Sequence, residues 1–174
     1  MSEPTSSPDQ GPALVALYDR ALPEVYGYLA SRCGSASVAE DLTSETFLAA
    51  VDAVRRGAVP ELTVAWLIGV ARHKLVDHWR RQGREARLAE ESASPAATVV
   101  EDDWDVRLDR MLAHETLAEL GPHHRSALTL RYLDGLPVRQ VAEHLGRTEG
   151  ATEVLLVRAR AAFRDRYERG RAAR

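Results

Sequence analysis

Apolar residues recur at helical spacing along almost the whole chain, and no stretch alternates between apolar and polar residues as a strand does. Glycines and prolines divide this pattern into segments of helical length. With 45% hydrophobic residues among 174, the chain has enough apolar material for one or two small domains with their own cores. We therefore predict an all-α fold made of two small helical domains.

The composition also predicts where these two domains are separated. Residues 89–104 are small, acidic and proline-containing, which is typical of a flexible linker. We predict a first domain over residues 12–88 and a second over residues 105–168. A disordered N-terminal tail, residues 1–11, and a basic C-terminal tail, residues 169–174, flank them.

Local signals predict several helix ends. Ser37 and Glu40 have the spacing of a capping box at a helix start, and Pro23 predicts a kink or a break in the preceding helix. Pro122 suits the first position of a helix, and Gly146 suits the left-handed turn that ends one.

The net charge of −3 conceals three strongly charged segments. Residues 72–87 carry six basic and two acidic residues, and residues 158–174 carry seven arginines and two acidic residues. Between them, residues 90–109 carry one arginine and seven acidic residues. The average charge argues against a general nucleic-acid coat, whereas the two basic segments suit phosphate contacts.

Several function classes lack the residues that they require. Cys33 is the single cysteine, so an internal disulfide or a multi-cysteine metal site is excluded. The histidines are not spaced as a metal pair on one helix face, and no phosphate loop or nucleophile motif occurs. We predict no enzyme, no cofactor and no metal. No apolar run approaches the roughly 20 residues of a membrane span, so we expect a soluble, cytoplasmic protein without membrane insertion.

The last two predicted helices have the pattern of a helix-turn-helix, with a glycine turn at Gly146 between them. The apolar face of the first comprises Val138, Val141, Ala142 and Leu145. The inner stripe of the second comprises Thr152, Leu156, Ala159, Phe163 and Tyr167. An ordinary helical hairpin has the same pattern, but the basic segment after Val157 favours DNA, because Arg158 and Arg164 suit phosphate contacts.

A long helix is predicted over about residues 63–82, with an inward stripe of Leu67, Val70, Ala71 and Leu75. Its other side carries Trp66, His73, Asp77, Arg80 and Arg84. Cations beside an aromatic ring suit single-stranded nucleic acid. The alternative is a solvated basic face, and we expect Trp66 itself to fold into the core near the helix start.

The helix predicted over residues 38–56 has an acidic face opposite its apolar stripe. Asp41, Glu45 and Asp52 lie on that face, with Leu48 among them. Such a face suits either simple solvation or docking of a basic partner helix. Phe47, on the apolar side, is expected in the core.

Three segments, in this order, resemble the extracytoplasmic-function (ECF) sigma factors of the bacterial sigma-70 family. VAEDLTSETFLAAV resembles the helix that binds core RNA polymerase, and AWLIGVARHKLVDHWRR resembles the promoter-melting helix that handles the −10 element. The segment from ETLAELGPHHR to VRARAAF resembles the domain that reads the −35 element. The resemblance covers about residues 13–88 and 108–167. It implies an alternative sigma factor that binds core polymerase and directs promoter-specific initiation.

The resemblance also implies roles for individual residues. The polymerase-binding set is Asp41, Leu42, Glu45, Leu48 and Asp52. The −10 set is His73, Asp77, Arg80, Arg81 and Arg84. The −35 set is Arg147, Thr148, Glu149, Glu153, Val154, Val157 and Arg158. The implied partners are core RNA polymerase and promoter DNA; many members also bind an anti-sigma factor, for which no residue here is diagnostic.

The chain departs from the family pattern at two places. His73 stands where the family often has asparagine, and Glu153, Val154, Leu155 and Val157 stand where it usually has basic or polar residues. Val154 and Val157 suit either thymine methyl groups or a protein partner. Two alternatives therefore stay open: a helix-turn-helix regulator that binds an operator, and a degenerate sigma-like interaction module.

Overall fold

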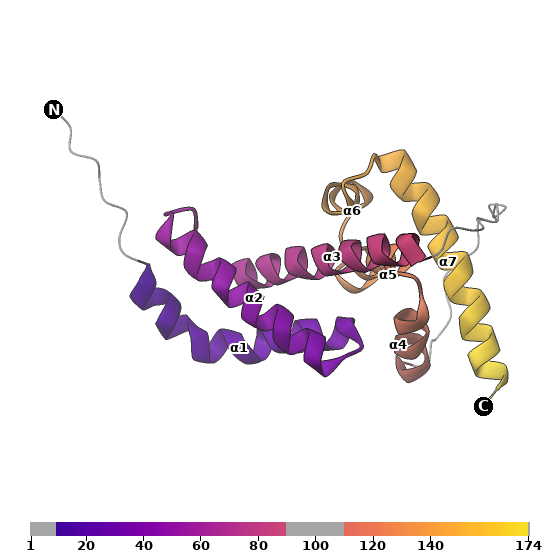
Figure 1. The fold of residues 1–174 in the computed structure, drawn as a ribbon, viewed down its shortest axis with the longest axis horizontal. Coiled ribbons are helices and arrows are strands. Elements are labelled where there is room, and N and C mark those ends of the chain that lie inside the picture. The colour runs from indigo at the N-terminus through magenta and orange to yellow at the C-terminus, as the bar shows by residue number, and fades with distance from the viewer. Residues whose placement is uncertain (1–9, 90–109, 174) are drawn as a thin grey trace. The chain divides into compact units, whose positions relative to one another are not determined.

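The computed structural model describes residues 10–89 and 110–173, and within these ranges all regular structure is helical. No strand occurs among the described residues, so the all-α prediction is confirmed. Figure 1 shows the helices in chain order: α1 (Gly11–Cys33), α2 (Ala36–Arg55), α3 (Val64–Ala89), α4 (Arg110–Glu119), α5 (Pro122–Leu128), the π-helix η1 (Thr129–Leu133), α6 (Val138–Leu145) and α7 (Glu149–Ala172). The predicted linker, residues 89–104, and the N-terminal tail lie almost wholly outside the described residues.

The chain divides into two compact units, Met1–Leu75 and Val76–Arg174. The division falls within α3, so the first unit contains α1, α2 and the start of α3, and the second contains the end of α3 together with α4 to α7.

In the first unit α1 and α2 pack against each other as a helical hairpin. The helix α1 continues through Pro23, so the predicted break is wrong. Ala21 and Val25, on either side of the proline, are both fully buried. Packing of these residues therefore outweighs the backbone hydrogen bond that a proline removes.

The connection between α1 and α2 consists of Gly34 and Ser35 alone. Gly34 adopts the left-handed conformation, with φ 70°, and Ser35 is extended and caps α2 by accepting a hydrogen bond from the Val38 amide at 3.5 Å. The predicted capping box of Ser37 and Glu40 is wrong. The left-handed glycine turns the chain early, so α2 begins two residues sooner.

The buried faces of the first unit follow the predicted helical stripes. On α2, Phe47 is 9% exposed and its ring lies 4.8 Å from that of Tyr18, centroid to centroid, as expected for a core residue. Val51, four residues after Phe47, is 38% exposed. The buried apolar residues are Leu14, Leu17, Ala21, Val25, Leu29 and Cys33 of α1, Ala39, Leu42, Phe47 and Ala50 of α2, Val59 between α2 and α3, and Leu67, Ala71 and Leu75 of α3.

The core of the second unit is formed by α4, α5 and α7, and every predicted inner residue of α7 is buried. This cluster comprises Leu112, Leu117, Leu120, Ala127, Leu128, Leu156, Ala159, Phe163 and Tyr167. Pro122 stands at the start of α5 and Gly146 adopts the left-handed conformation after α6, both as predicted. Arg125 joins α5 to the end of α4 by donating to the carbonyls of Leu117 and Leu120.

The π-helix η1 was not predicted. The Asp134 amide donates to the Thr129 carbonyl at 3.0 Å, five residues back, which widens the helix by one residue. Tyr132 and Leu133 are then about half exposed, at 47% and 49%. Such insertions frequently occur at functional sites.

Candidate functional surfaces

The acidic side of α2 is largely exposed. Asp41 and Asp52 are exposed, Glu45 is half-buried, and Leu48 is 69% exposed in their midst. Leu42 is different, because only 2% of it is exposed. Its side chain lies on the inward stripe, where it supports the helix.

Two ion pairs cross this acidic surface. Lys74 Nζ of α3 lies 3.7 Å from Glu45 Oε2, and Arg56 Nη2 lies 3.0 Å from Asp52 Oδ2. Both pairs are substantially exposed, so each contributes only about 0–1 kcal/mol.

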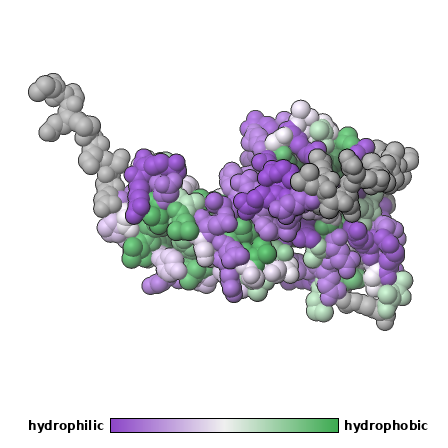
Figure 2. Space-filling model, viewed as in Figure 1, coloured by the Kyte–Doolittle hydropathy of each residue, from purple (hydrophilic) through white to green (hydrophobic). Residues whose placement is uncertain are grey.

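Exposed apolar residues occur on both helices of the hairpin. Val15 and Tyr18 of α1 are 75% and 42% exposed, and Leu48 and Val51 of α2 are 69% and 38% exposed. Figure 2 shows green apolar residues interspersed with hydrophilic ones on the surface of α1 and α2. The exposed apolar residues of α1 were not predicted from the sequence.

The outer side of α3 carries exposed His73, Asp77, Arg81 and Arg84. The Nδ1 atom of His73 donates to the Gly69 carbonyl at 2.8 Å, which leaves Nε2 as the acceptor of the neutral ring. Trp66 is half-buried near the helix start, where its amide donates to the Thr63 hydroxyl.

Arg80 differs from the other members of its predicted set because it is half-buried and engaged within the protein. Its Nη2 atom donates to the carbonyl of His144, the penultimate residue of α6, and its Nη1 atom lies 3.6 Å from Asp77 Oδ1. Arg81 and Arg84 are therefore the exposed cations of this surface.

The turn into α7 presents Arg147 and Glu149 to solvent. Thr148 caps the helix, because its Oγ1 atom accepts a hydrogen bond from the Ala151 amide at 3.2 Å. The hydroxyl therefore has a structural task that the sequence pattern of a reading helix did not reveal.

Beyond the cap, the outer side of α7 carries Glu153 and Arg158, both exposed, and Val154, which is 49% exposed. Val157 is half-buried, and Leu155 is half-buried against the core. The apolar character of the outer face is therefore concentrated at Val154.

Two family models match the chain, one over its first three helices and the other over its later helices. Residues 17–85 match sigma-70 region 2, and residues 110–163 match sigma-70 region 4. The chain is 32% identical over 144 residues to the ECF RNA polymerase sigma factor SigL of Mycobacterium tuberculosis, covering 79% of each protein. The chain belongs to the ECF sigma factors.

Other ECF sigma factors show similar identity. BldN of Streptomyces coelicolor is 33% identical over 152 residues, which cover 82% of this chain but only 56% of BldN, so the chain spans little more than half the length of that relative. SigM of Bacillus subtilis is 27% identical, and the match covers 88% of this chain and 94% of SigM.

A solved sigma factor structure shares the fold. The sigma factor RpoE of Bartonella quintana, solved in complex with the anti-sigma factor NepR, superposes with a TM-score of 0.55 at 20% identity, covering 90% of this chain and 97% of that one. In this sigma factor family, proteins act in transcription initiation without catalysis of their own.

Within this ECF sigma factor, the acidic surface of α2 and the outer side of α3 lie in the region 2 match, whereas α4 to α6 and most of α7 lie in the region 4 match. None of the described helices is long and apolar enough to cross a membrane. Among the same residues, no group of three or more histidine, cysteine or acidic side chains is arranged to hold a metal ion.

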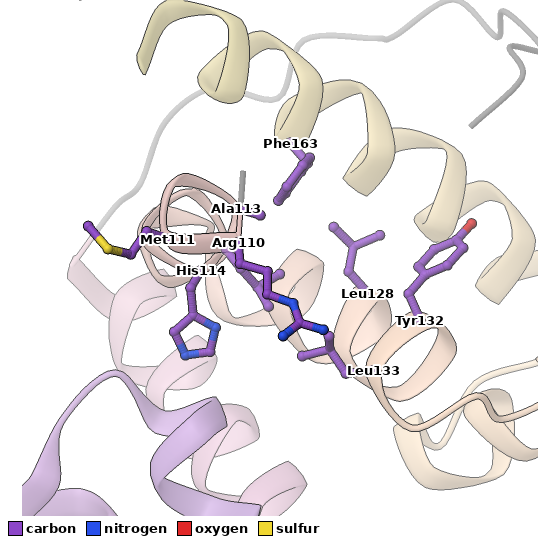
Figure 3. Close-up of a pocket in the computed structure, with 9 residues that line it drawn as sticks. Arg110, Met111, Ala113, His114, Leu128, Tyr132, Leu133 and Phe163 are labelled. Atoms are coloured by element: carbon purple, nitrogen blue, oxygen red, sulfur yellow. The ribbon is translucent and has the colours of Figure 1, made fainter. Parts of the chain in front are cut away.

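One feature of region 4 escaped the sequence reasoning. A cavity of about 600 Å³ opens between α4, η1 and α7. Figure 3 shows Arg110 and His114 of α4 on one side, and Leu128, Tyr132 and Leu133 on the other. The lining is mostly apolar, which suits an apolar side chain of a protein partner. The π-helix exposes Tyr132 and Leu133 here, and no simple periodicity predicts that.

A second missed feature is the environment of His124 on α5. Burial, together with the nearby charges of Arg166 and Arg158, lowers the pKa of His124 below its usual value of 6.5. The cluster brings a histidine of α5 close to two arginines of α7, a proximity that residue spacing does not indicate.

Proposed function

We propose that this chain binds core RNA polymerase and directs initiation at a specific set of promoters as an alternative sigma factor. The functional segments are residues 12–88 and 105–168, connected by the acidic segment 89–104. The single observation that carries the proposal is the presence of sigma-70 regions 2 and 4, in that order, in one chain. Its site of action is then the cytoplasm, where polymerase and promoters are found.

The polymerase-docking surface in this proposal is the exposed side of α2. Asp41, Glu45 and Asp52 supply negative charge, and Leu48 supplies an exposed apolar contact in their centre. An apolar residue ringed by charges is a common arrangement at protein interfaces, where the charges orient the partner. Leu42 supports this surface from beneath.

The −10 surface in this proposal is the outer side of α3. Arg81 and Arg84 are exposed and suit contacts with backbone phosphates, and His73 adds an exposed ring that suits stacking on an unpaired base. Arg80 and Asp77 complete the set. This surface would capture bases of the non-template strand as the promoter opens.

The −35 surface in this proposal is the turn and outer face of α7. Arg147 and Arg158 suit phosphate contacts, and Glu149 and Glu153 suit donors such as cytosine N4. Val154 suits a thymine methyl group, with Val157 as a partly covered neighbour. Thr148 positions the helix through its cap.

A second candidate function, a sigma-like interaction module, is favoured by the exposed Val154 beside Glu153. An acid and an exposed valine provide no phosphate contact, and they suit a protein partner as well as a base pair. An anti-sigma factor is the natural candidate partner, since the structurally similar RpoE was solved with NepR.

In vitro transcription with core polymerase over a genomic DNA library tests the proposal. We expect the chain to co-elute with the core and to start transcripts at a shared promoter sequence. We also expect a weak mobility shift of promoter DNA by the lone chain and a strong one with core polymerase. A tight, specific shift by the lone chain, without transcripts, would instead identify an operator-binding regulator.

Replacing Leu48 with aspartate tests the docking surface separately. Because the position is exposed, the added charge should leave the fold intact. Core binding should fall by about tenfold or more, as for loss of an apolar contact at an interface centre. Ala58→Asp, at an exposed position after the end of α2 and outside the docking surface, is the matched control because it adds the same charge.

A further inference from the structure

The cavity between α4, η1 and α7 lies entirely within the second compact unit and has the size of a small-molecule site. Its volume is about 600 Å³, and pockets that bind small ligands usually enclose about 300–1,000 Å³. Most of its wall is apolar, with Leu117, Leu128, Leu133 and Phe163 among the lining residues. A ligand for this space therefore needs an apolar body.

The polar groups of the wall gather mainly on α4. Arg110 and His114 both line the cavity, and their spacing of four residues places them on the same side of this helix. Figure 3 shows both side chains extending from α4 beside the cavity. Among the described residues that line it, none is acidic. Arg110 therefore gives the cavity a positive charge.

Arg110 and His114 are accessible to a ligand. Both residues are exposed, and within residues 10–89 and 110–173 neither side chain forms a hydrogen bond or an ion pair. A guanidinium can bind a carboxylate through two parallel, charge-assisted hydrogen bonds. A ring N–H of His114, one turn along α4, supplies a further donor. This end of the cavity therefore suits a carboxylate.

The π-helix forms the opposite wall. Tyr132 and Leu133 of η1 line the cavity, and each is about half exposed. The Tyr132 hydroxyl accepts a long hydrogen bond, 3.4 Å, from Arg160 Nη1 of α7, the helix that also supplies Phe163. This bond ties the π-helix to α7 across the floor of the site. Insertions of this kind frequently mark functional sites.

We propose that this cavity binds a fatty carboxylate, with its hydrocarbon chain against the apolar wall and its carboxylate on Arg110 and His114. The apolar side chain of a protein partner would fill the space but would leave the guanidinium without a counter-charge. A fatty carboxylate supplies both parts in one molecule. Because ligand and side chain would exclude each other, the ligand would regulate access of such a partner. The site goes beyond the proposed role in initiation, since its binding needs neither promoter nor polymerase.

Calorimetric titration of the full chain with dodecanoate, below its micellar concentration, tests the site. We expect saturable binding of one molecule per chain. Decanoate, which is two methylene groups shorter, should bind roughly tenfold more weakly, because each buried methylene contributes about fourfold to affinity. Dodecyltrimethylammonium has the same chain length and the opposite charge. It should bind at least tenfold more weakly than dodecanoate, because Arg110 repels it.

Two pairs of variants locate the binding. Arg110→Gln should weaken dodecanoate binding about fivefold, whereas Arg139→Gln, at an exposed arginine of α6 outside the cavity, should leave it unchanged. Leu133→Glu should weaken binding at least tenfold by placing a carboxylate in the apolar wall. Val154→Glu is its matched control, because both positions are 49% exposed and only Leu133 lines the cavity.

The absence of saturable binding to the full chain would overturn the proposal and leave the cavity to a protein partner. Equal affinities for dodecanoate and dodecyltrimethylammonium, or equal losses in each variant and its control, would also overturn it, since they indicate unspecific uptake of an amphiphile. Circular dichroism checks the fold of all four variants. If Leu133→Glu unfolds, Arg110→Gln at its exposed position still decides the outcome. In vitro transcription without fatty acid tests the proposed initiation function separately.

Discussion

The two helices that we propose to bind DNA, α3 and α7, both bury one stripe and expose another, but their exposed stripes differ in chemistry. On α3 the exposed side carries Arg81 and Arg84. On α7 the exposed side begins with Glu153 and Val154, and arginine follows only from Arg158. Arginine side chains bind the phosphates of any DNA sequence and so raise affinity. A carboxylate and a methyl group contact base edges and so discriminate among base pairs. We infer that the two helices contribute unequally, α3 to strength and α7 to choice.

The largest expected effect comes from removing the cations of α3. Arg81→Ala with Arg84→Ala should lower open-complex formation by about 100-fold, because each change removes a charge-assisted contact of about 1.5 kcal/mol. Core binding should stay unchanged. Permanganate footprinting measures the first, and co-elution with core polymerase measures the second.

The control for that experiment is Arg20→Ala with Arg55→Ala, which removes the same charge at exposed positions outside the predicted surfaces. If this control lowers open-complex formation equally, total charge rather than the α3 surface is responsible. The contrast between α3 and α7 would then lose its basis.

A smaller effect is expected on α7 from Val154→Ser with Val157→Ser. A lost methyl contact with thymine is worth about 1 kcal/mol, so preference at one or two −35 positions should relax by roughly fivefold. Selection of −35 sequences from a randomised promoter pool measures this. An unchanged −35 preference with altered binding of a protein partner would assign the valines to an interface and leave α7 without its discriminating role.

A third change separates the structural and reading roles of Thr148. Thr148→Ala should lower the free energy of unfolding by about 1 kcal/mol through loss of the α7 cap, whereas Thr148→Ser retains the cap. Ser35→Ala, at the longer 3.5 Å cap of α2, is the counterpart in the first unit and should cost less. Urea denaturation measures all three. Wild-type stability of Thr148→Ala would show that the hydroxyl is available for DNA.

The smallest effect concerns His124. Because burial and two arginines lower its pKa in the folded protein, the unfolded chain binds this proton more readily. The contribution of His124 to stability is therefore intact above its unfolded pKa of about 6.5 and is lost as the pH falls below it. His124→Gln should raise Tm relative to wild type increasingly as the pH is lowered from 7 to about 5.5. A pH-independent difference would show that the charge of His124 is immaterial.

The sequence predicted the helices and their inward stripes well, because packing imposes a regular period. All five inner residues of α7 are buried, and Gly146 turns the chain as expected. The ends of the helices were predicted less well. The predicted cap at Ser37 is not used. Ser35 caps α2 instead, because the left-handed conformation of Gly34 places the start of the helix there. Likewise, Pro23 did not break α1, since buried neighbours hold the helix together.

The candidate surfaces were predictable as helix faces but not as individual contacts. Periodicity put Leu42 and Leu48 on one helix without showing that the first is 2% exposed and the second 69%. The partner of Arg80 is 64 residues away in sequence, so no local pattern identifies it. The π-helix inserts one residue into α5 and its continuation, which shifts Tyr132 and Leu133 outward against the expected period.

Lys74, which lies 3.7 Å from Glu45, is the one lysine in a chain with 23 basic residues. Reagents that modify primary amines therefore have a single side-chain target, beside the acidic surface of α2. Its side chain is about one-third exposed, so the rate of acylation at this amine is a direct reporter of anything that covers Glu45. Mass spectrometry of the labelled chain would read that occupancy from one peptide, without any engineered tag.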